Sequence, residues 1–479
     1  MEKTNEFLEK EPLGLLMRKY AIPCVIALLV AALYNIVDQI FIANAAYLGS
    51  NGNAANTVVY PLTVIALAVA MMLGDGCCAF VSINLGAKRA EDAHRGVGTT
   101  AVSVLAAGIV LTAIYLIFQD TALTIFGAQV NEDTFALSKE YFFWITLGIP
   151  FYMFAQAMSP VIRSDGSPRY AMAVLLTGAV LNIVLDPICI YVLRWGMTGA
   201  ALATIFGQIV SAILSAVYLT KMKAVKLSRD SFRPRWGILK RVAPMGTASL
   251  LSQISVVLSI AAVLNMLKTY GAADPVFGQA EYSQIPTAVM GIVSKFYQIV
   301  VSIAVGLACG CMPVFGYNLG AGRHDRVRAL ERLLLITELI VGAVFTAVFL
   351  IFPVPMINLF GAENESPYYT EFAVRSIWAF LCALPLTCLN KGVFIFMEAL
   401  GKSKESTLLS MLREVGFGAG LPLVMPLLFG LYGILWFNPL ADLLALIPSV
   451  ILLRRTHRDL DKNAPAETVL RELASPAGI

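Results

Sequence analysis

Two acidic residues lie inside long apolar stretches of this chain. Asp38 falls within the apolar run of residues 20–46, and Asp186 falls within the run of residues 170–193. If such a run crosses a lipid bilayer, an ionisable side chain within it costs on the order of several kcal/mol unless it is paired or hydrated. Carboxylates at these positions therefore indicate a site that binds a proton or a cation.

Polar residues with hard oxygen ligands accompany the two acids. Asn182 lies four residues before Asp186, so the two side chains share one face of a helix. Thr204 lies about seven residues into the next apolar run, and Asp38 and Asp186 lie about eight residues from the ends of theirs. At about 1.5 Å per residue, all three lie about 10–13 Å from the same membrane surface.

These residues, Asp38, Asn182, Asp186 and Thr204, predict a coupling site for H+ or Na+. Two buried carboxylates close together also favour retention of one proton near neutral pH, which proton coupling requires. The alternative is that the two acids only bind polar neighbours and so hold helices together.

Composition requires that lipid covers much of this chain. Of its 479 residues, 58% are hydrophobic and 14% are charged, whereas soluble domains have about 25% charged residues. The mean hydropathy is +0.75. These values exclude a soluble enzyme, a disordered protein and a nucleic-acid binder, and the net charge of +4 is too small to indicate a polyanionic partner. The sequence predicts an all-α integral membrane protein.

Apolar windows of about 20 residues predict twelve spanning helices. They cover residues 20–46, 57–83, 97–118, 136–162, 170–193, 197–220, 241–267, 291–317, 330–352, 370–397, 406–428 and 431–453. Turn residues separate them, as in Leu48-Gly-Ser-Asn-Gly-Asn53. With the N-terminus inside, most of the 35 basic residues fall in inner segments, so both termini are expected in the cytoplasm and the protein in the cell membrane.

The chain repeats itself at a spacing near 234 residues. Asn84-Leu-Gly-Ala87 recurs as Asn318-Leu-Gly-Ala321, Gly166 as Gly401, and Gly196-x-x-Gly199 as Gly430-x-x-Gly433. Six helices per repeat place both halves in the same orientation, as in transporters that rock two bundles about a central cleft. We expect an N-terminal lobe at 1–220, a linker at 221–240, a C-terminal lobe at 241–453 and a cytoplasmic tail at 454–479.

The repeat also serves as an internal control. The second-half positions equivalent to the four coupling residues lie near Ser259, Phe417, Gly420 and Asn438, and none is acidic. A carboxylate pair needed only for packing would be required twice. The ion site is therefore expected in the N-terminal lobe alone.

Other residues within the spans are weaker candidates. Tyr34, Gln156, Met153, Tyr297, Lys391 and Asp442 are candidates for the lining of a substrate cavity. Packing or helix pairing is the alternative for each, and Lys391 either pairs with an acid or faces the cavity. Arg413 and Lys295 are expected to extend toward the membrane surface. No nucleotide-binding, metal or nucleophile motif is present in the sequence, so no cofactor is expected.

The sequence resembles the multidrug and toxic compound extrusion (MATE) family, in particular its bacterial MepA-like or DinF-like branch. The motifs that carry the resemblance are the repeated Asn-Leu-Gly-Ala, Val37-Asp-Gln-Ile-Phe-Ile42, Asn182-x-x-x-Asp186, Gly196-x-x-Gly-Ala-Ala-x-Ala-Thr204 and Gly430-x-x-Gly433. The resemblance implies efflux of bulky, often cationic or amphipathic compounds by H+ or Na+ antiport, with the cation at Asp38, Asn182, Asp186 and Thr204.

Where this sequence departs from the family, the departure lies in the second half. Other members carry acids in the seventh and tenth spans, whereas this chain has Ser252, Gln253 and Ser255 in the former and Lys391 in the latter. A second-half sodium site is therefore not expected. The sequence predicts a monomeric drug antiporter rather than an enzyme. The nearest alternative, a lipid-linked oligosaccharide flippase of the same superfamily, needs a basic cavity for a pyrophosphate.

Overall fold

The computed structural model describes residues 5–45, 47–126, 132–279, 281–358 and 366–461. Within these ranges the chain forms helices and no strands. Part of the predicted cytoplasmic tail, residues 462–479, lies outside the described residues, as does much of the turn at 361–367. The predicted domain boundaries stay predictions.

The first half supplies six long helices. They are α2 (Leu13–Asn44), α3 (Gly49–Gly86), α4 (Ala90–Ile117), α6 (Glu132–Ser164), α7 (Pro168–Pro187) and α8 (Gly196–Leu219), with the short α1 (Phe7–Lys10) and α5 (Gln119–Ile125) beside them. The predicted turn at 48–53 is wrong, because α3 begins at Gly49 and includes those residues. Asn and Gly residues are typical of a loop, but here the helix extends through them.

The second half repeats this arrangement. Its helices are α9 (Trp236–Met245), α10 (Thr247–Ala272), α11 (Ile285–Gly320), α12 (His324–Ile351), α13 (Pro353–Asn358), α14 (Pro367–Leu381), α15 (Leu384–Ala399), α16 (Ser403–Ser410), α17 (Gly418–Gly433) and α18 (Phe437–Asp461). Helices α14 and α15 together make one crossing.

Eleven helical stretches in the described part are long and apolar enough to span a bilayer. The last of them covers 59 residues, Ser403–Asp461. A straight helix of that length would measure about 90 Å, about three times the thickness of the hydrocarbon core. The chain reverses at Gly430, whose φ of 59° is left-handed, so this stretch holds two crossings and the predicted twelve are confirmed.

The internal repeat is visible in the backbone. Left-handed φ angles occur at Gly166 and Gly196 in the first half and at Gly401 and Gly430 in the second. The Asn-Leu-Gly-Ala turns also match, because Asn84 Nδ2 donates to the carbonyl of Phe80 and Asn318 Nδ2 donates to the carbonyl of Val314, each over 2.8 Å. Twelve helices in two six-helix lobes follow from this duplication.

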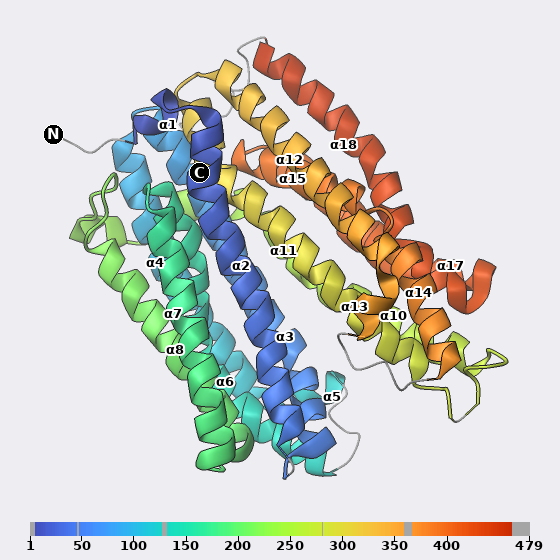
Figure 1. Cartoon of the computed structure of the whole chain (residues 1–479). Helices are drawn as coiled ribbons and strands as arrows, with labels where there is room; N and C mark the ends of the chain where they lie inside the picture. The colour runs from blue at the N-terminus through green and yellow to red at the C-terminus, as the bar shows by residue number, and fades with distance from the viewer. Residues whose placement is uncertain (1–4, 46, 127–131, 280, 359–365, 462–479) are drawn as a thin grey trace.

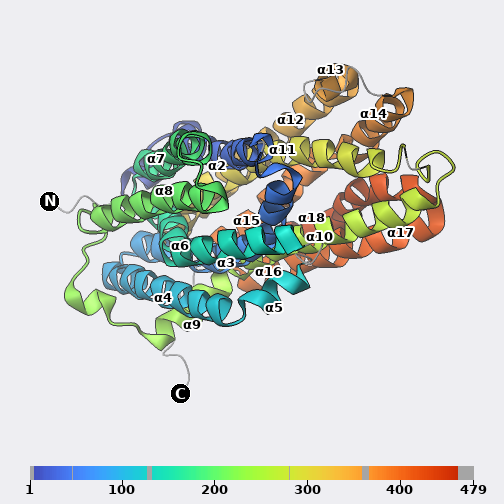
Figure 2. The same ribbon diagram turned by 90° about the horizontal axis from the view of Figure 1, so that it is seen from below.

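The two lobes lean together at one end and diverge toward the other (Figure 1). The view from below shows the same two groups of helices (Figure 2). We call the end where they meet the basic face; it carries α1 and the connections 87–89, 165–167, 220–235, 321–323 and 400–402.

Two glycines in equivalent positions let the lobes meet closely at the basic face. A Cβ added at Gly86 would lie 2.0 Å from the carbonyl oxygen of Tyr317, and one added at Gly320 would lie 2.0 Å from the carbonyl oxygen of Ile83. Because neither position has room for a side chain, α3 and α11 pack backbone to backbone. This reciprocal contact joins the N-terminal lobe to the C-terminal lobe.

The N-terminal segment also bridges the lobes at the basic face. Asn5 Nδ2 donates to the carbonyl of Ser164 over 2.9 Å in the first lobe. Arg326, in the second lobe, donates to the carbonyl of Leu8 over 3.2 Å and to that of Glu11 over 2.6 Å. Since the segment binds both lobes, it stabilises the closed basic face.

Candidate functional site

The acid pair of the N-terminal lobe, Asp38 and Asp186, lies on two neighbouring helices. Asp38 is near the end of α2 and is 8% exposed, whereas Asp186 is near the end of α7 and is fully buried. The two carboxyl groups lie within hydrogen-bonding reach of each other. The structure therefore brings together two acids that are far apart in the sequence.

Amide and hydroxyl groups surround the acid pair. Asn182 Nδ2 lies 3.0 Å from Asp186 Oδ1 and 3.1 Å from Thr204 Oγ1. A second amide, Asn56 on α3, forms a side-chain hydrogen bond with Asp38. The sequence interpretation missed Asn56 because it placed the preceding residues in a turn.

The backbone of α7 changes its winding immediately after Asp186. Pro187 has no N–H, so it cannot bond the carbonyl four residues earlier. Residues Ile188–Val192 then form a π-helical segment, a feature found frequently at functional sites. This local irregularity positions Asp186 at the end of the regular helix, facing α2 and α8.

The chemistry of the acid pair suits a proton or a small hard cation. Asp38 Oδ1, Asp186 Oδ2 and Asn182 Oδ1 are buried and accept no hydrogen bond from a donor. Within the described part of the chain, neither acid forms an ion pair with a basic side chain. Because two carboxylates in contact repel each other when both are ionised, the site favours a bound positive charge.

The C-terminal lobe holds a different charged cluster, the Arg413 network. Arg413 Nε lies 2.9 Å from Asp442 Oδ1, and Arg413 Nη1 lies 3.2 Å from Glu414 Oε2. Lys391 forms an ion pair with Glu414. Two cations and two anions thus neutralise each other, so this network does not demand an additional ion.

Arg413 and its partners correct one sequence expectation. Arg413 does not extend toward the membrane surface, because it is buried and its Nη2 also donates to Tyr297 Oη over 2.9 Å and to Asn438 Oδ1 over 3.0 Å. Asn438 is the repeat equivalent of Thr204, so the network occupies the region that holds the acid pair in the first lobe. The π-helical segment Met411–Phe417 presents both Arg413 and Glu414 inward.

Replacing Arg413 by alanine should destabilise the protein strongly. The change leaves the buried carboxylate of Asp442 without its cation, and breaking a buried ion pair in this way costs about 3–5 kcal/mol. The free energy of unfolding, measured by SDS titration in mixed micelles, should fall by that amount. The double variant Arg413→Met/Asp442→Leu should recover more than half of the loss; a loss below about 1 kcal/mol in the single variant would contradict the assigned role of this network.

Comparison with known proteins identifies the family of this chain. The family model MatE matches residues 23–188 and 261–423, which is more than half of the chain. The chain belongs to the MatE family. The resemblance inferred from the motifs is thereby confirmed, and the two matched segments fall on the two lobes.

Several relatives of this MatE-family chain are known. Multidrug export protein MepA of Staphylococcus aureus (strain MRSA252) is 25% identical over 454 residues, which cover 93% of this chain and 94% of MepA. The solved structure of the MATE multidrug transporter DinF-BH in complex with the dye rhodamine 6G is 30% identical, with a TM-score of 0.82, and covers 92% of this chain and 95% of its own. A structure of a MATE family transporter of the MOP superfamily in an outward-facing conformation has a TM-score of 0.85 at 22% identity and covers 96% and 100%, which shows the shared fold.

The predicted cavity residues of this MatE-family chain lie in different surroundings. Met153 is fully buried in the core of the first lobe, whereas Tyr34 and Gln156 are half-buried. Tyr297, Lys391 and Asp442 belong to the Arg413 network. Their role in substrate binding stays a prediction, since the network already supplies each of the last three with a partner. Lys295 is half-buried, and its extension toward the surface also stays a prediction.

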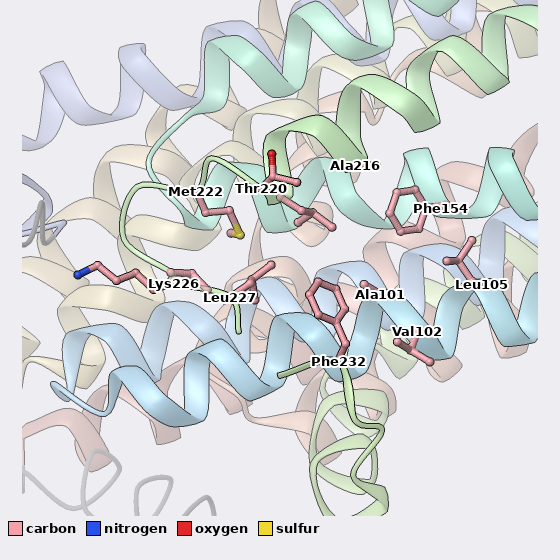
Figure 3. Close-up of a pocket in the computed structure, with 12 residues that line it drawn as sticks. Ala101, Val102, Leu105, Phe154, Ala216, Thr220, Met222, Lys226, Leu227 and Phe232 are labelled. Atoms are coloured by element: carbon pink, nitrogen blue, oxygen red, sulfur yellow. The ribbon is translucent and has the colours of Figure 1, made fainter. Parts of the chain in front are cut away.

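A cavity of about 550 Å³ lies in the first lobe, away from the acid pair. Figure 3 shows Phe154 of α6 and Phe232 of the linker among its lining residues, with Met222 and Leu227 nearby. Apart from Thr220 and Lys226 its lining is apolar. The cavity lies between α4, α6, α8 and the linker rather than between the lobes, so we do not assign it to substrate.

The sequence interpretation also missed four buried acids within the helices: Asp75, Glu331, Glu338 and Glu398. Each is at most 3% exposed. The same criterion that selected Asp38 and Asp186, an ionisable residue in an apolar run, would have found Asp75, Glu331 and Glu338, whereas Glu398 lies one residue beyond the predicted run 370–397. Asp75 and Glu398 come from different lobes and both contact Ser249.

Proposed function

We propose that this protein is a secondary active multidrug efflux transporter that exports bulky, often cationic or amphipathic compounds in exchange for protons. The observation that carries the proposal is the acid pair, which is buried, has oxygens free to bind a cation, and lies in a chain of the MatE family. Relatives named as multidrug exporters support the substrate class.

The orientation proposed here puts the basic face in the cytoplasm, as the distribution of Lys and Arg favours. The lobes meet at this face and their helices diverge away from it (Figure 1), which supports a state that is open to the outside in this orientation. In alternating access the two lobes rock about the substrate, and the reciprocal glycine contact at the basic face must open in the inward-facing state.

In the proposed cycle the acid pair couples the proton to the substrate. With the lobes open to the outside, a proton from the external solution binds at Asp38 and Asp186 and neutralises one carboxylate. Rearrangement of α2 then favours release of the substrate. After the lobes reverse, the proton leaves to the cytoplasm and a new substrate binds. The acid pair must therefore lose and regain one proton in each cycle.

The geometry of the acid pair favours H+ over Na+ as the coupling ion. The two carboxyl groups lie within hydrogen-bonding reach of each other, so one shared proton can join them, which supports H+ as the coupling ion. The comparison of the two gradients described below decides between the ions.

A flippase for an anionic pyrophosphate lipid has less support. Its cavity would need cations available to the ligand. Lys391 and Arg413 are the basic residues deepest in the C-terminal lobe, and both are bound by carboxylates. The Arg413 network therefore leaves neither cation available for a pyrophosphate.

Purified protein in liposomes tests the proposal and the choice of ion. The dye rhodamine 6G, bound in the structure of the DinF-BH relative, serves as the fluorescent probe. We expect transport of the dye when a pH gradient is imposed and none when a sodium gradient of equal size is imposed at constant pH. Transport driven by sodium alone would overturn proton coupling, and no transport with either gradient would overturn antiport.

A further inference from the structure

A second pair of buried carboxylates lies where the two lobes meet near the basic face. Asp75 belongs to α3 of the N-terminal lobe and Glu398 to α15 of the C-terminal lobe, and they are 1% and 0% exposed. Ser249, from α10 of the C-terminal lobe, lies between them. We call these three residues the junction cluster.

The hydrogen bonds of Ser249 require a proton in this cluster. Its Oγ lies 2.9 Å from Asp75 Oδ2, 3.0 Å from Glu398 Oε1 and 3.2 Å from Glu398 Oε2. A hydroxyl carries one hydrogen and can donate it to only one carboxylate at a time. For the other short contact to be a hydrogen bond, the second carboxyl must itself be protonated and donate to Ser249.

The balance of charge around the junction cluster also indicates one bound proton. Among the described residues, the one basic side chain that electrostatically contacts Asp75 is Arg163, whose Nη2 lies 3.9 Å from Asp75 Oδ1. In the described part of the chain, the other titratable groups in electrostatic contact with Asp75, Arg163 or Glu398 are the buried thiols Cys24, Cys78 and Cys309, which are neutral when protonated. One cation against two carboxylates leaves one uncompensated negative charge, and a single proton removes it. Asp75 Oδ1, which accepts no hydrogen bond, is a further position for it.

The two lobes contribute opposite sides of the cluster. Gly166 and Gly401 are equivalent in the repeat, so Arg163 and Glu398, each three residues earlier, occupy equivalent positions with opposite charge. Asp75 and Arg163 move with the first lobe, whereas Ser249 and Glu398 move with the second. Any motion that separates the lobes at the basic face therefore breaks the contacts that hold the proton.

We propose that Asp75 and Glu398 form a second proton-binding site, shared between the lobes, that is occupied while the basic face is closed. While the lobes are open to the outside, the cluster takes up this proton from the external solution. When the lobes separate at the basic face, water enters and the carboxylic acid transfers its proton to water, which yields a carboxylate and a hydronium ion on the cytoplasmic side. The proposal rests on the proton antiport proposed above, and it adds a second proton to each cycle.

The number of protons per substrate tests the second site directly. Liposomes with the full-length protein are held at zero membrane potential, and the rhodamine 6G gradient at which net flux vanishes is measured for a pH difference of one unit. One coupled proton balances a dye gradient of about tenfold, and two balance about hundredfold. We expect about hundredfold for the unmodified protein and about tenfold for Glu398→Gln. The matched control Glu331→Gln, a buried glutamate of the same lobe that binds His457 instead, should keep about hundredfold.

The outcomes separate this inference from the proposed function. Zero coupling to pH in the unmodified protein would overturn both. A balancing dye gradient of about tenfold in the unmodified protein, or of about hundredfold in Glu398→Gln, would overturn the second site and leave proton antiport intact. An equal fall of the balancing dye gradient in Glu331→Gln would also overturn the second site, because the fall would then not be specific to the junction cluster.

A spectroscopic measurement covers the case in which Glu398→Gln does not transport. Infrared absorption of a protonated carboxyl group at neutral pH should be lost in both Asp75→Asn and Glu398→Gln, because the two residues share one proton. The same absorption should persist in Asp38→Asn. If neither junction variant loses a protonated carboxyl absorption, the second site is wrong.

Discussion

Replacing Asp38 or Asp186 by asparagine should abolish pH-driven dye efflux. Asparagine has nearly the same shape as a protonated aspartic acid, so the helices around the acid pair should still pack. An amide, however, cannot release and regain a proton, and each cycle requires both steps. Efflux from the reconstituted variants should fall to the rate of liposomes without protein.

The control for this experiment is an acid on the surface of the first lobe. Asp120, on α5, is exposed and binds Lys139 of α6, so Asp120→Asn removes one carboxylate without touching the acid pair. We expect efflux by this variant to match the unmodified protein. Efflux retained by both Asp38→Asn and Asp186→Asn would show that neither residue couples the proton.

A side chain at Gly320 should hold the basic face open. A Cβ there would lie 2.0 Å from the carbonyl oxygen of Ile83, so valine at this position must push α3 and α11 apart. Overpacking of this kind costs about 2 kcal/mol or more, which shifts the equilibrium about thirtyfold toward separated lobes. Efflux should therefore fall at least tenfold in Gly320→Val.

The native cysteines report the opening that Gly320→Val should cause. Cys309 is buried at the lobe junction, whereas Cys388 is buried inside the C-terminal lobe. At constant pH, maleimide labelling of Cys309 should increase about tenfold in the variant while labelling of Cys388 stays unchanged. Increased labelling of both thiols would indicate unfolding instead of opening.

A second glycine of the same helix provides the matched variant. Gly291, also on α11, has no neighbouring atom near the position of an added Cβ. Gly291→Val should therefore leave both efflux and Cys309 labelling near the values of the unmodified protein. Equal losses of efflux in the two variants would mean that the close approach of the helices at Gly320 is not the cause of the lost efflux.

The fold could be predicted from the sequence because the bilayer imposes simple rules. A spanning helix needs about 20 apolar residues, and the repeat supplied a second copy of each feature. The start of α3 was predicted wrongly because Asn and Gly residues indicated a turn, and membrane helices tolerate such residues where other helices satisfy them. The same error concealed Asn56 from the predicted site.

The acid pair was accessible to sequence reasoning because its members share one depth along their helices. The partners of Arg413 were not, since pairing depends on which faces of α15, the π-helical segment Met411–Phe417 and α18 meet, and no periodicity in the sequence determines that. The junction cluster depends on contact between the lobes and on the single hydrogen of Ser249. Asp75 could be selected from the sequence because it lies in an apolar run, but Glu398 lies just beyond its predicted run, and the contact between the two acids could not be predicted.

The most direct test of proton coupling at the acid pair is proton release on substrate binding. Purified protein in weakly buffered detergent solution is mixed with rhodamine 6G, and a pH-indicator dye records the protons released. If substrate and proton exclude each other, linkage requires that binding of the substrate displaces about one proton. We predict this release in the unmodified protein and its absence in Asp38→Asn and Asp186→Asn; undiminished release by both variants would contradict coupling through these two carboxylates.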